Sequence, residues 1–407
     1  MTLRWTPAGM AVGVGGLAAT AAGAWLGAPL LVLLAAAALA GLTLDAAAIL
    51  RSRPHASFAV SPQRIPEGQA STVTVTTARL RPSQQVRIPL AGPLRLAKGS
   101  NLLGSGAAEA TFEVTCEARG PHAIGPVLVR TWGPLRLWAA EESLGEEQVL
   151  EVVPREDDAS GVSLRSRVVT PVQGRFQVNR PGQGFDFFTL REYRSGDTMR
   201  SINWKATARR DGEFIVNQRQ VETHGEVTIL LDARAPTGLG LAGQTPLDRG
   251  CRIALGIFSE ALSHRDTVHF IAYGSELHEL PATRQDRIIR LQKMLAFLEA
   301  GGNTPLAQAW SRILRDVRSS SGPVLIVTTA EADPTLVETV RSMVGRGHAV
   351  TVISPTPGDA ILGEREQARR RQAREATLTG LRDAGAAVKD WEQGHVTIEA
   401  PMRRIGL

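Results

Sequence analysis

The sequence predicts a multi-domain chain: a transmembrane helical hairpin, then a small β-sandwich, then a doubly wound α/β domain. Three observations predict this order. No charged residue occurs between Arg4 and Asp45, period-two alternation runs from Phe58 to Val153, and apolar strands alternate with helical stretches from Val227 onward. The expected boundaries are 1–50 for the hairpin, 55–155 for the sandwich, 156–222 for a connecting segment and 223–407 for the α/β domain.

The uncharged N-terminal stretch is 40 residues long, and one membrane helix needs ~20 apolar residues. We therefore expect two spans, Met10–Leu26 and Ala28–Leu44, with a turn at Gly27–Pro29 between them. A single long helix and a cleaved signal sequence are the alternatives. Because arginines flank both ends of the stretch, we expect a two-pass anchor in the inner or plasma membrane with the soluble domains in the cytoplasm.

The second segment contains short alternating runs separated by turn residues such as Gly92-Pro93 and Gly133-Pro134. This spacing, without a long amphipathic stretch, is typical of a small β-sandwich. It holds no cluster of histidines, cysteines or paired acids, so we expect a spacer or a binding module. The expected strands include 71–76, 110–115, 127–130 and 149–153.

The C-terminal segment alternates strands with helices, which predicts a parallel sheet covered on both faces. We expect strands at 227–232, 267–273, 324–328, 349–353 and 387–391, and helices at 246–264, 284–300, 305–318, 334–345 and 362–384. Ligands of such sheets bind beyond the carboxyl ends of the strands. The candidate residues for that edge are Asp232, Thr304 and Thr328.

The net charge of +6 does not indicate a nucleic-acid-binding protein. Only four of the 46 basic residues are lysine, so the arginine excess is a compositional habit. No basic stripe coincides with a nucleic-acid-binding motif. We therefore expect no nucleic-acid partner.

The least ordinary stretch is Gly182–Arg209, which mixes cations and aromatic rings with a few carboxylates. Such groups are costly to bury unless they are paired. The stretch is therefore either a charged clamp between two domains or a basic-aromatic surface for an acidic partner, a phosphate or headgroups. Burial of Trp204 and Arg200 would favour the clamp. We also expect Asp197 to cap a helix from Met199 to Arg209. The candidate residues are Arg191, Glu192, Tyr193, Gly196, Asp197, Arg200, Asn203, Trp204, Lys205 and Arg209.

This stretch resembles the signature of the domain-of-unknown-function-58 family, in its runs Leu190–Tyr193, Gly196-Asp197 and Ile202–Lys205. Arg119–His122 with Gly125-Pro126 resembles the strand region that usually precedes that signature. The resemblance implies a bacterial protein, often anchored by two helices and often encoded beside a MoxR-type AAA+ ATPase. It implies an interaction or assembly role and no established reaction.

The α/β domain resembles a von Willebrand factor A domain, in which an Asp-x-Ser-x-Ser loop, a distant threonine and a later aspartate hold a divalent cation. Here the loop reads Asp232-Ala-Arg-Ala-Pro236, so Arg234 and Pro236 replace both serines. Thr304 matches the distant threonine, and no aspartate directly follows the strand that ends at Thr328. A hard cation needs several oxygen ligands, so we expect no cofactor. The alternative is a Mg²⁺- or Mn²⁺-dependent binding domain that uses Asp232 and Thr304.

No phosphate-binding loop, Gly-x-Ser-x-Gly or His-Glu-x-x-His motif occurs in the sequence. We therefore expect a protein without catalytic activity that binds a partner protein beside the membrane, with a MoxR-type AAA+ ATPase as the candidate partner. The remaining alternative is an enzyme of unknown type that uses the Arg/Glu/Asp residues of the signature stretch.

Overall fold

A computed structural model describes the chain in two compact units, Met1–Val153 and Pro154–Leu407. The described residues are 2–77, 83–104, 108–156, 181–193, 199–209, 214–220, 226–263, 266–283, 288–316, 322–330, 333, 335–355, 361–392 and 395–397.

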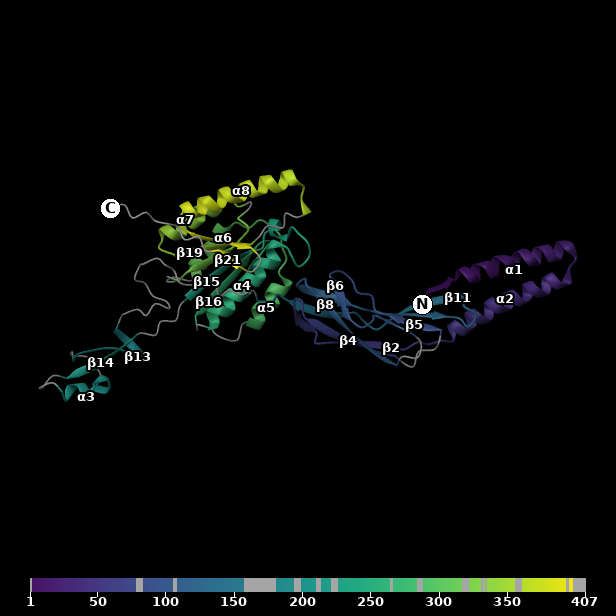
Figure 1. Cartoon of the computed structure of the whole chain (residues 1–407), viewed down its shortest axis with the longest axis horizontal. Coiled ribbons are helices and arrows are strands. Elements are labelled where there is room, and N and C mark those ends of the chain that lie inside the picture. Colours follow the sequence, from purple (N-terminus) through teal and green to yellow (C-terminus); the bar gives the residue numbers. More distant parts are fainter. Residues whose placement is uncertain are drawn as a thin grey trace. The chain divides into compact units, whose positions relative to one another are not determined.

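The first unit begins with the helical hairpin. Helices α1 (Pro7–Leu26) and α2 (Pro29–Leu50) lie side by side (Figure 1), and Gly27 makes the turn in the left-handed conformation that favours glycine. Both helices are long and apolar enough to cross a membrane. α2 continues beyond the expected end at Leu44 and carries Asp45 as a buried residue.

The rest of the first unit is formed by β-sheets. A five-stranded sheet has the order β1 (Thr2–Trp5), β11 (Trp138–Leu144), β10 (Val127–Trp132), β5 (Gln84–Arg87), β7 (Leu102–Leu103). A four-stranded sheet has the order β2 (Ala56–Ser61), β4 (Ala70–Thr77), β8 (Glu109–Cys116), β6 (Leu94–Lys98). A third has the order β3 (Arg64–Pro66), β12 (Gln148–Val153), β9 (Gly120–Ile124). Alternate residues of these strands share one core, which includes Val73, Phe112, Val129 and Leu150, as a sandwich requires.

The hairpin and the sandwich are connected at both ends of the hairpin. β1 precedes α1 and pairs antiparallel with β11. At the base of α2, the Asp45 carboxylate accepts hydrogen bonds from the backbone amides of Leu135, Leu137 and Trp138 at 2.7, 2.9 and 2.9 Å. The two ends of the hairpin therefore join the same sheet and the turn beside it.

The second unit is built on a seven-stranded sheet. Its order is β17 (Leu277–Thr283), β16 (Thr267–Tyr273), β15 (Glu226–Asp232), β18 (Val324–Val327), β19 (Val350–Pro355), β20 (Ala387–Glu392), β21 (His395–Thr397). The five inner strands are parallel, and the edge strands β17 and β21 are antiparallel to their neighbours. The sequence predicted the inner strands and missed both edges.

Helices cover both faces of this sheet (Figure 1). α4 (Pro246–Ser263) and α5 (Ile288–Phe297) share one core with Ile229 and Leu231. α6 (Leu306–Asp316), α7 (Leu336–Gly345) and α8 (Glu364–Asp383) share the other with Leu230. Neighbouring residues of β15 thus enter different cores, as in a strand buried on both faces. The predicted fold class, from hairpin to mixed α/β domain, is confirmed.

Candidate functional site

The carboxyl edge of the α/β sheet holds a buried cluster of charges. Asp232 ends β15, and Arg234 lies in the loop before the short 3₁₀ helix η2 (Ala235–Gly238). Arg234 donates from Nε to Oδ1 of Asp232 at 2.9 Å and from Nη2 to Oδ2 at 2.7 Å. Its backbone amide also donates to Oδ1, at 3.0 Å. Since Arg234 is 1% exposed, this two-pronged ion pair is closed off from solvent.

Two further segments reach the same cluster. After β18, the Thr328 hydroxyl donates to Oδ2 of Asp232 at 2.7 Å. Farther along that loop, Oδ2 of Asp333 lies 3.6 Å from Nη1 of Arg234. The Arg234 guanidinium also lies over the Tyr273 ring, 5.7 Å from its centroid, at the end of β16. The ends of three adjacent parallel strands and the loops beyond them therefore meet at one guanidinium.

The electrostatics of this cluster favour the charged form of Arg234. Burial by itself would lower the pKa of the guanidinium, but the hydrogen bonds and charge of Asp232 outweigh it and raise that pKa. Burial, followed by the charge of Asp232, raises the pKa of the Tyr273 phenol well above its usual value. Tyr273 therefore stays neutral beside a charged arginine.

The residues at this edge do not fit a divalent cation. The guanidinium occupies the place between the carboxylates, since both oxygens of Asp232 accept from Arg234 and Oδ2 of Asp333 lies 3.6 Å from its Nη1. Within the described part of the chain, no three His, Cys, Asp or Glu side chains are grouped so as to hold a metal. A guanidinium in their midst also repels a cation.

The three residues expected at the edge are only partly brought together. Asp232 and Thr328 are in contact. Thr304 lies two residues before α6, and its backbone amide donates to the carbonyl of Gly274 at 3.3 Å. The sequence analysis identified Arg234 in place of a loop serine but did not include Asp333, because no aspartate directly follows the strand that ends at Thr328. Its position five residues after Thr328 was the available signal.

The signature stretch forms a small substructure of its own. β13 (Pro181–Glu192) pairs antiparallel with β14 (Ile215–Gln220), and α3 (Trp204–Thr207) packs beside β14. The expected single helix from Met199 to Arg209 is wrong. A 3₁₀ turn spans Met199–Ser201, and Ile202 then forms an isolated β-bridge with Val216. The helix α3 begins only after this bridge, at Trp204.

Asn203 caps this second helix, since its side-chain oxygen accepts from the amide of Ala206 at 3.0 Å. Its amide nitrogen donates to the Asn217 side chain at 2.8 Å, which fixes α3 on β14. Asp197, the expected cap, lies with Gly196 outside the described residues. The side chains of Arg191 and Arg200 also lie outside the described residues, and so do the ion pairs that the clamp interpretation expects of them.

Two aromatic rings of the stretch, Tyr193 and Trp204, gather on the surface with Phe214, the residue before β14. We call Tyr193, Trp204 and Phe214 the aromatic cluster. The Phe214 ring lies 6.3 Å from that of Tyr193 and 6.2 Å from that of Trp204, edge-on to both. Trp204, Phe214 and Tyr193 are 60%, 48% and 39% exposed. Lys205, which follows Trp204 in α3, and Arg209, two residues after the end of that helix, are also exposed, as is Glu192. Exposure of Trp204 favours the surface interpretation of the stretch.

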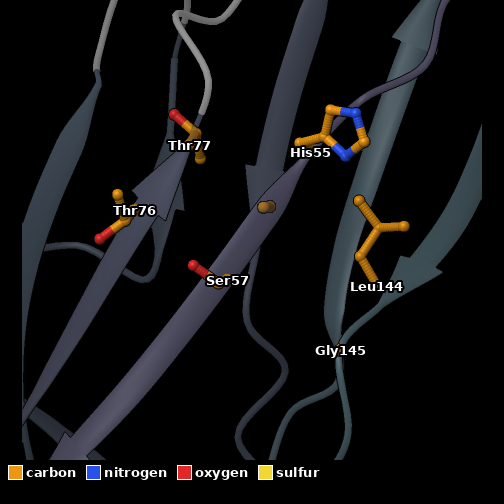
Figure 2. A pocket seen from close by; sticks show the side chains of 7 residues that line it. His55, Ser57, Thr76, Thr77, Leu144 and Gly145 are labelled. Carbon is orange, nitrogen blue, oxygen red and sulfur yellow. The ribbon is translucent and has the colours of Figure 1, made fainter.

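The sandwich contains a hollow of about 410 Å³ that the sequence did not predict. It is lined by His55, Ser57, Thr76, Thr77 and Leu144, with Ala56 and Gly145 (Figure 2). The lining offers one imidazole and three hydroxyls without a carboxylate. It therefore lacks the base-and-orienter arrangement of a hydrolytic triad.

Residues 189–368 match the profile of the family described as Protein of unknown function DUF58. The chain carries a DUF58 region. This confirms the predicted resemblance over the residues that contain the aromatic cluster and the charged edge. No curated protein sequence matches the chain.

Solved structures similar to the chain include the manganese-loaded TRAP protein of Plasmodium vivax, at 12% identity and a TM-score of 0.28, over 38% of this chain and 63% of that one. The SpRpn10 VWA domain is similar at 11% identity and a TM-score of 0.28, over 39% of this chain and 82% of that domain. The D00-D0 domain of Intimin is similar at 17% identity and a TM-score of 0.17, over 24% and 46%. The chain thus spans less than two thirds of the TRAP chain, and scores this low carry no inference about function.

Proposed function

We propose that this DUF58 protein is a membrane-anchored interaction protein that binds a partner through the aromatic cluster and catalyses no reaction itself. The observation that carries the proposal is the exposure of three neighbouring aromatic rings. Most large apolar side chains of a folded domain are buried, and contiguous exposed ones mark binding surfaces. Tryptophan and tyrosine are also the residues that most often dominate binding energy.

A two-pass anchor is supported by the way both ends of the hairpin return to one sheet. β1 and the base of α2 both contact the region of β11. This arrangement requires the two ends to lie on the same side of a membrane, as a single span would not allow. Arg4, Arg51 and Arg53 flank the helices, so the positive-inside tendency assigns that side to the cytoplasm.

The proposed partner is a MoxR-type AAA+ ATPase with an acidic docking surface. The ATPase is suggested by the family resemblance, in which such proteins are often encoded together. The acidic surface is suggested by the exposed cations Lys205 and Arg209, which lie in and just after α3, the helix that carries Trp204. Complementary charges at the rim of an interface speed association and select the partner.

The test is a binding measurement with the full chain in lipid nanodiscs and a purified MoxR-type ATPase from the same genome. Trp204→Ala should weaken binding about thirtyfold, the loss of a typical interface hot spot. Ile361→Ala is the matched control, because Ile361 is a similarly exposed apolar residue of the same unit, at 52%. Undetectable binding by the unaltered chain would refute the partner. Equal binding by a folded Trp204→Ala variant would refute the role of the cluster.

A further inference from the structure

The loop after β15 differs in one informative way from the cation loop of an A domain. Arg234 stands where the first serine of Asp-x-Ser-x-Ser would stand, directly after Asp232 and one spacer residue. Substitution of a ligand serine would by itself leave a weakened site. Substitution by a buried arginine instead brings a positive charge to the place where the cation would lie.

The contacts of this arginine are those that a bridging cation would make. Its guanidinium takes both oxygens of Asp232 and lies 3.6 Å from Oδ2 of Asp333. That same Oδ2 accepts from the amide of Leu306, at the start of α6, at 3.1 Å. One positive group thus connects the carboxyl end of β15, the loop after β18 and, through Asp333, the first residue of α6.

We propose that the Arg234 guanidinium is an internal replacement for the divalent cation of A domains, holding the loops of the sheet edge together without metal. Two consequences arise from its burial. A carboxylate of a partner cannot reach a group that is 1% exposed, so this edge does not bind ligands in the metal-dependent manner. The native chain is also indifferent to divalent cations.

Formal charges explain why removal of the arginine should open a cation site. Asp232 and Asp333 are both buried and together carry two formal negative charges, which Arg234 partly balances. Without the guanidinium, the carboxylates of Asp232 and Asp333 would be left unbalanced beside the space that it leaves, with the Thr328 hydroxyl 2.7 Å from one of them. Carboxylates and hydroxyls are the oxygen ligands that hard cations select. Arg234→Ser should therefore convert the edge into a Mn²⁺ site.

The experiment compares thermal unfolding of the full chain in detergent, in EDTA and in Mn²⁺. The unaltered chain should unfold at the same temperature in both. Arg234→Ser should unfold earlier in EDTA and regain about 5 °C when Mn²⁺ exceeds its dissociation constant a hundredfold. Isothermal titration with Mn²⁺ alone should give heat for Arg234→Ser and none for the unaltered chain.

Two control variants assign the effect to this edge. Arg234→Ser combined with Asp232→Asn should lose the Mn²⁺ response. Arg252→Ser, which removes another arginine of the same unit that contacts a backbone carbonyl, should gain none. A Mn²⁺-dependent rise in the unaltered chain would overturn the proposal. An Arg234→Ser variant without a Mn²⁺ response would also overturn it, whether the variant is folded in EDTA or unfolded in both conditions. Recovery of an unfolded Arg234→Ser variant by Mn²⁺ would support the proposal.

Discussion

Asp45 offers the sharpest test of how the hairpin is joined to the sandwich. Asp45 is 1% exposed, and its carboxylate accepts from the backbone amides of Leu135 and Leu137 in the turn before β11 and of Trp138, the first residue of that strand. Asp45→Ala removes both acceptor oxygens, and with them all three hydrogen bonds, and leaves the amide of Leu137 without this partner in a buried position. The other two amides are half-buried and can turn to water.

The magnitude can be worked out from these surroundings. A buried donor that loses its partner costs about 1–3 kcal/mol, and each of the two half-buried bonds contributes about 0.5–1.5 kcal/mol. The turn should therefore lose roughly 2–6 kcal/mol of local stability. Since 1.4 kcal/mol is tenfold, the exchange of these amides should accelerate by about thirtyfold or more.

Hydrogen–deuterium exchange of the full chain in nanodiscs measures this directly. The peptide that covers 133–138 should exchange faster in Asp45→Ala, and a peptide from β8 should not change. Asp45→Asn should lie between, because the amide keeps one acceptor oxygen. Gly133→Ala should act like Asp45→Ala, since an added Cβ would collide with the Asp45 carboxylate. Exchange at the unaltered rate in a folded Asp45→Ala variant would show that the carboxylate does not hold the turn.

Two further predictions concern the α/β domain. Phe258→Ala should destabilise it by about 3–5 kcal/mol in urea titration, because the Phe258 side chain on α4 is 1% exposed in the core beside the sheet. Leu241→Ala, at a 59% exposed site, should cost about 0.5 kcal/mol or less. Equal effects of the two substitutions would contradict the described core. Burial and then the charge of Arg346 lower the pKa of His348 below its usual 6.5. Between that lowered pKa and about 6.5 the unfolded chain therefore binds more protons than the folded one, and stability should fall as the pH drops through this interval. His348→Phe should keep an edge contact with the Trp310 ring and should lessen this loss of stability, measured as the difference between the urea midpoints at pH 7.5 and pH 5. The same difference in the variant and in the unaltered chain would refute the role of His348.

Local patterns predicted the elements whose burial is regular. Four of the five inner strands, β15, β16, β18 and β19, are largely apolar runs, and their positions agree with the expected ones within a few residues. The edge strands were missed because their patterns are weak. β17 contains Pro281 and polar residues, and β21 has three residues. Edge strands pair on one side only and tolerate such sequences.

The signature stretch shows where local rules misled the prediction. Asp197 and Asn203 are both good helix caps by residue type, and the sequence favoured the first. The bridge between Ile202 and Val216 interrupts the expected helix, so that Asn203 caps the separate helix α3. Pairing with a strand 14 residues away thus decided a boundary that propensity could not.

The sequence by itself determined the hairpin, the alternating sheet and the family resemblance, because hydrophobic period and signature residues are properties of contiguous chain. Only the tertiary structure decided which distant groups meet. β1, which precedes the hairpin in the sequence, pairs with β11, which follows it. Asp333 lies beside the ion pair of Asp232 and Arg234, about a hundred residues earlier in the chain. Such contacts depend on which loops converge at a sheet edge. The physical reason is that a buried charge requires a partner, and the arrangement of the strands determines which partner lies within reach.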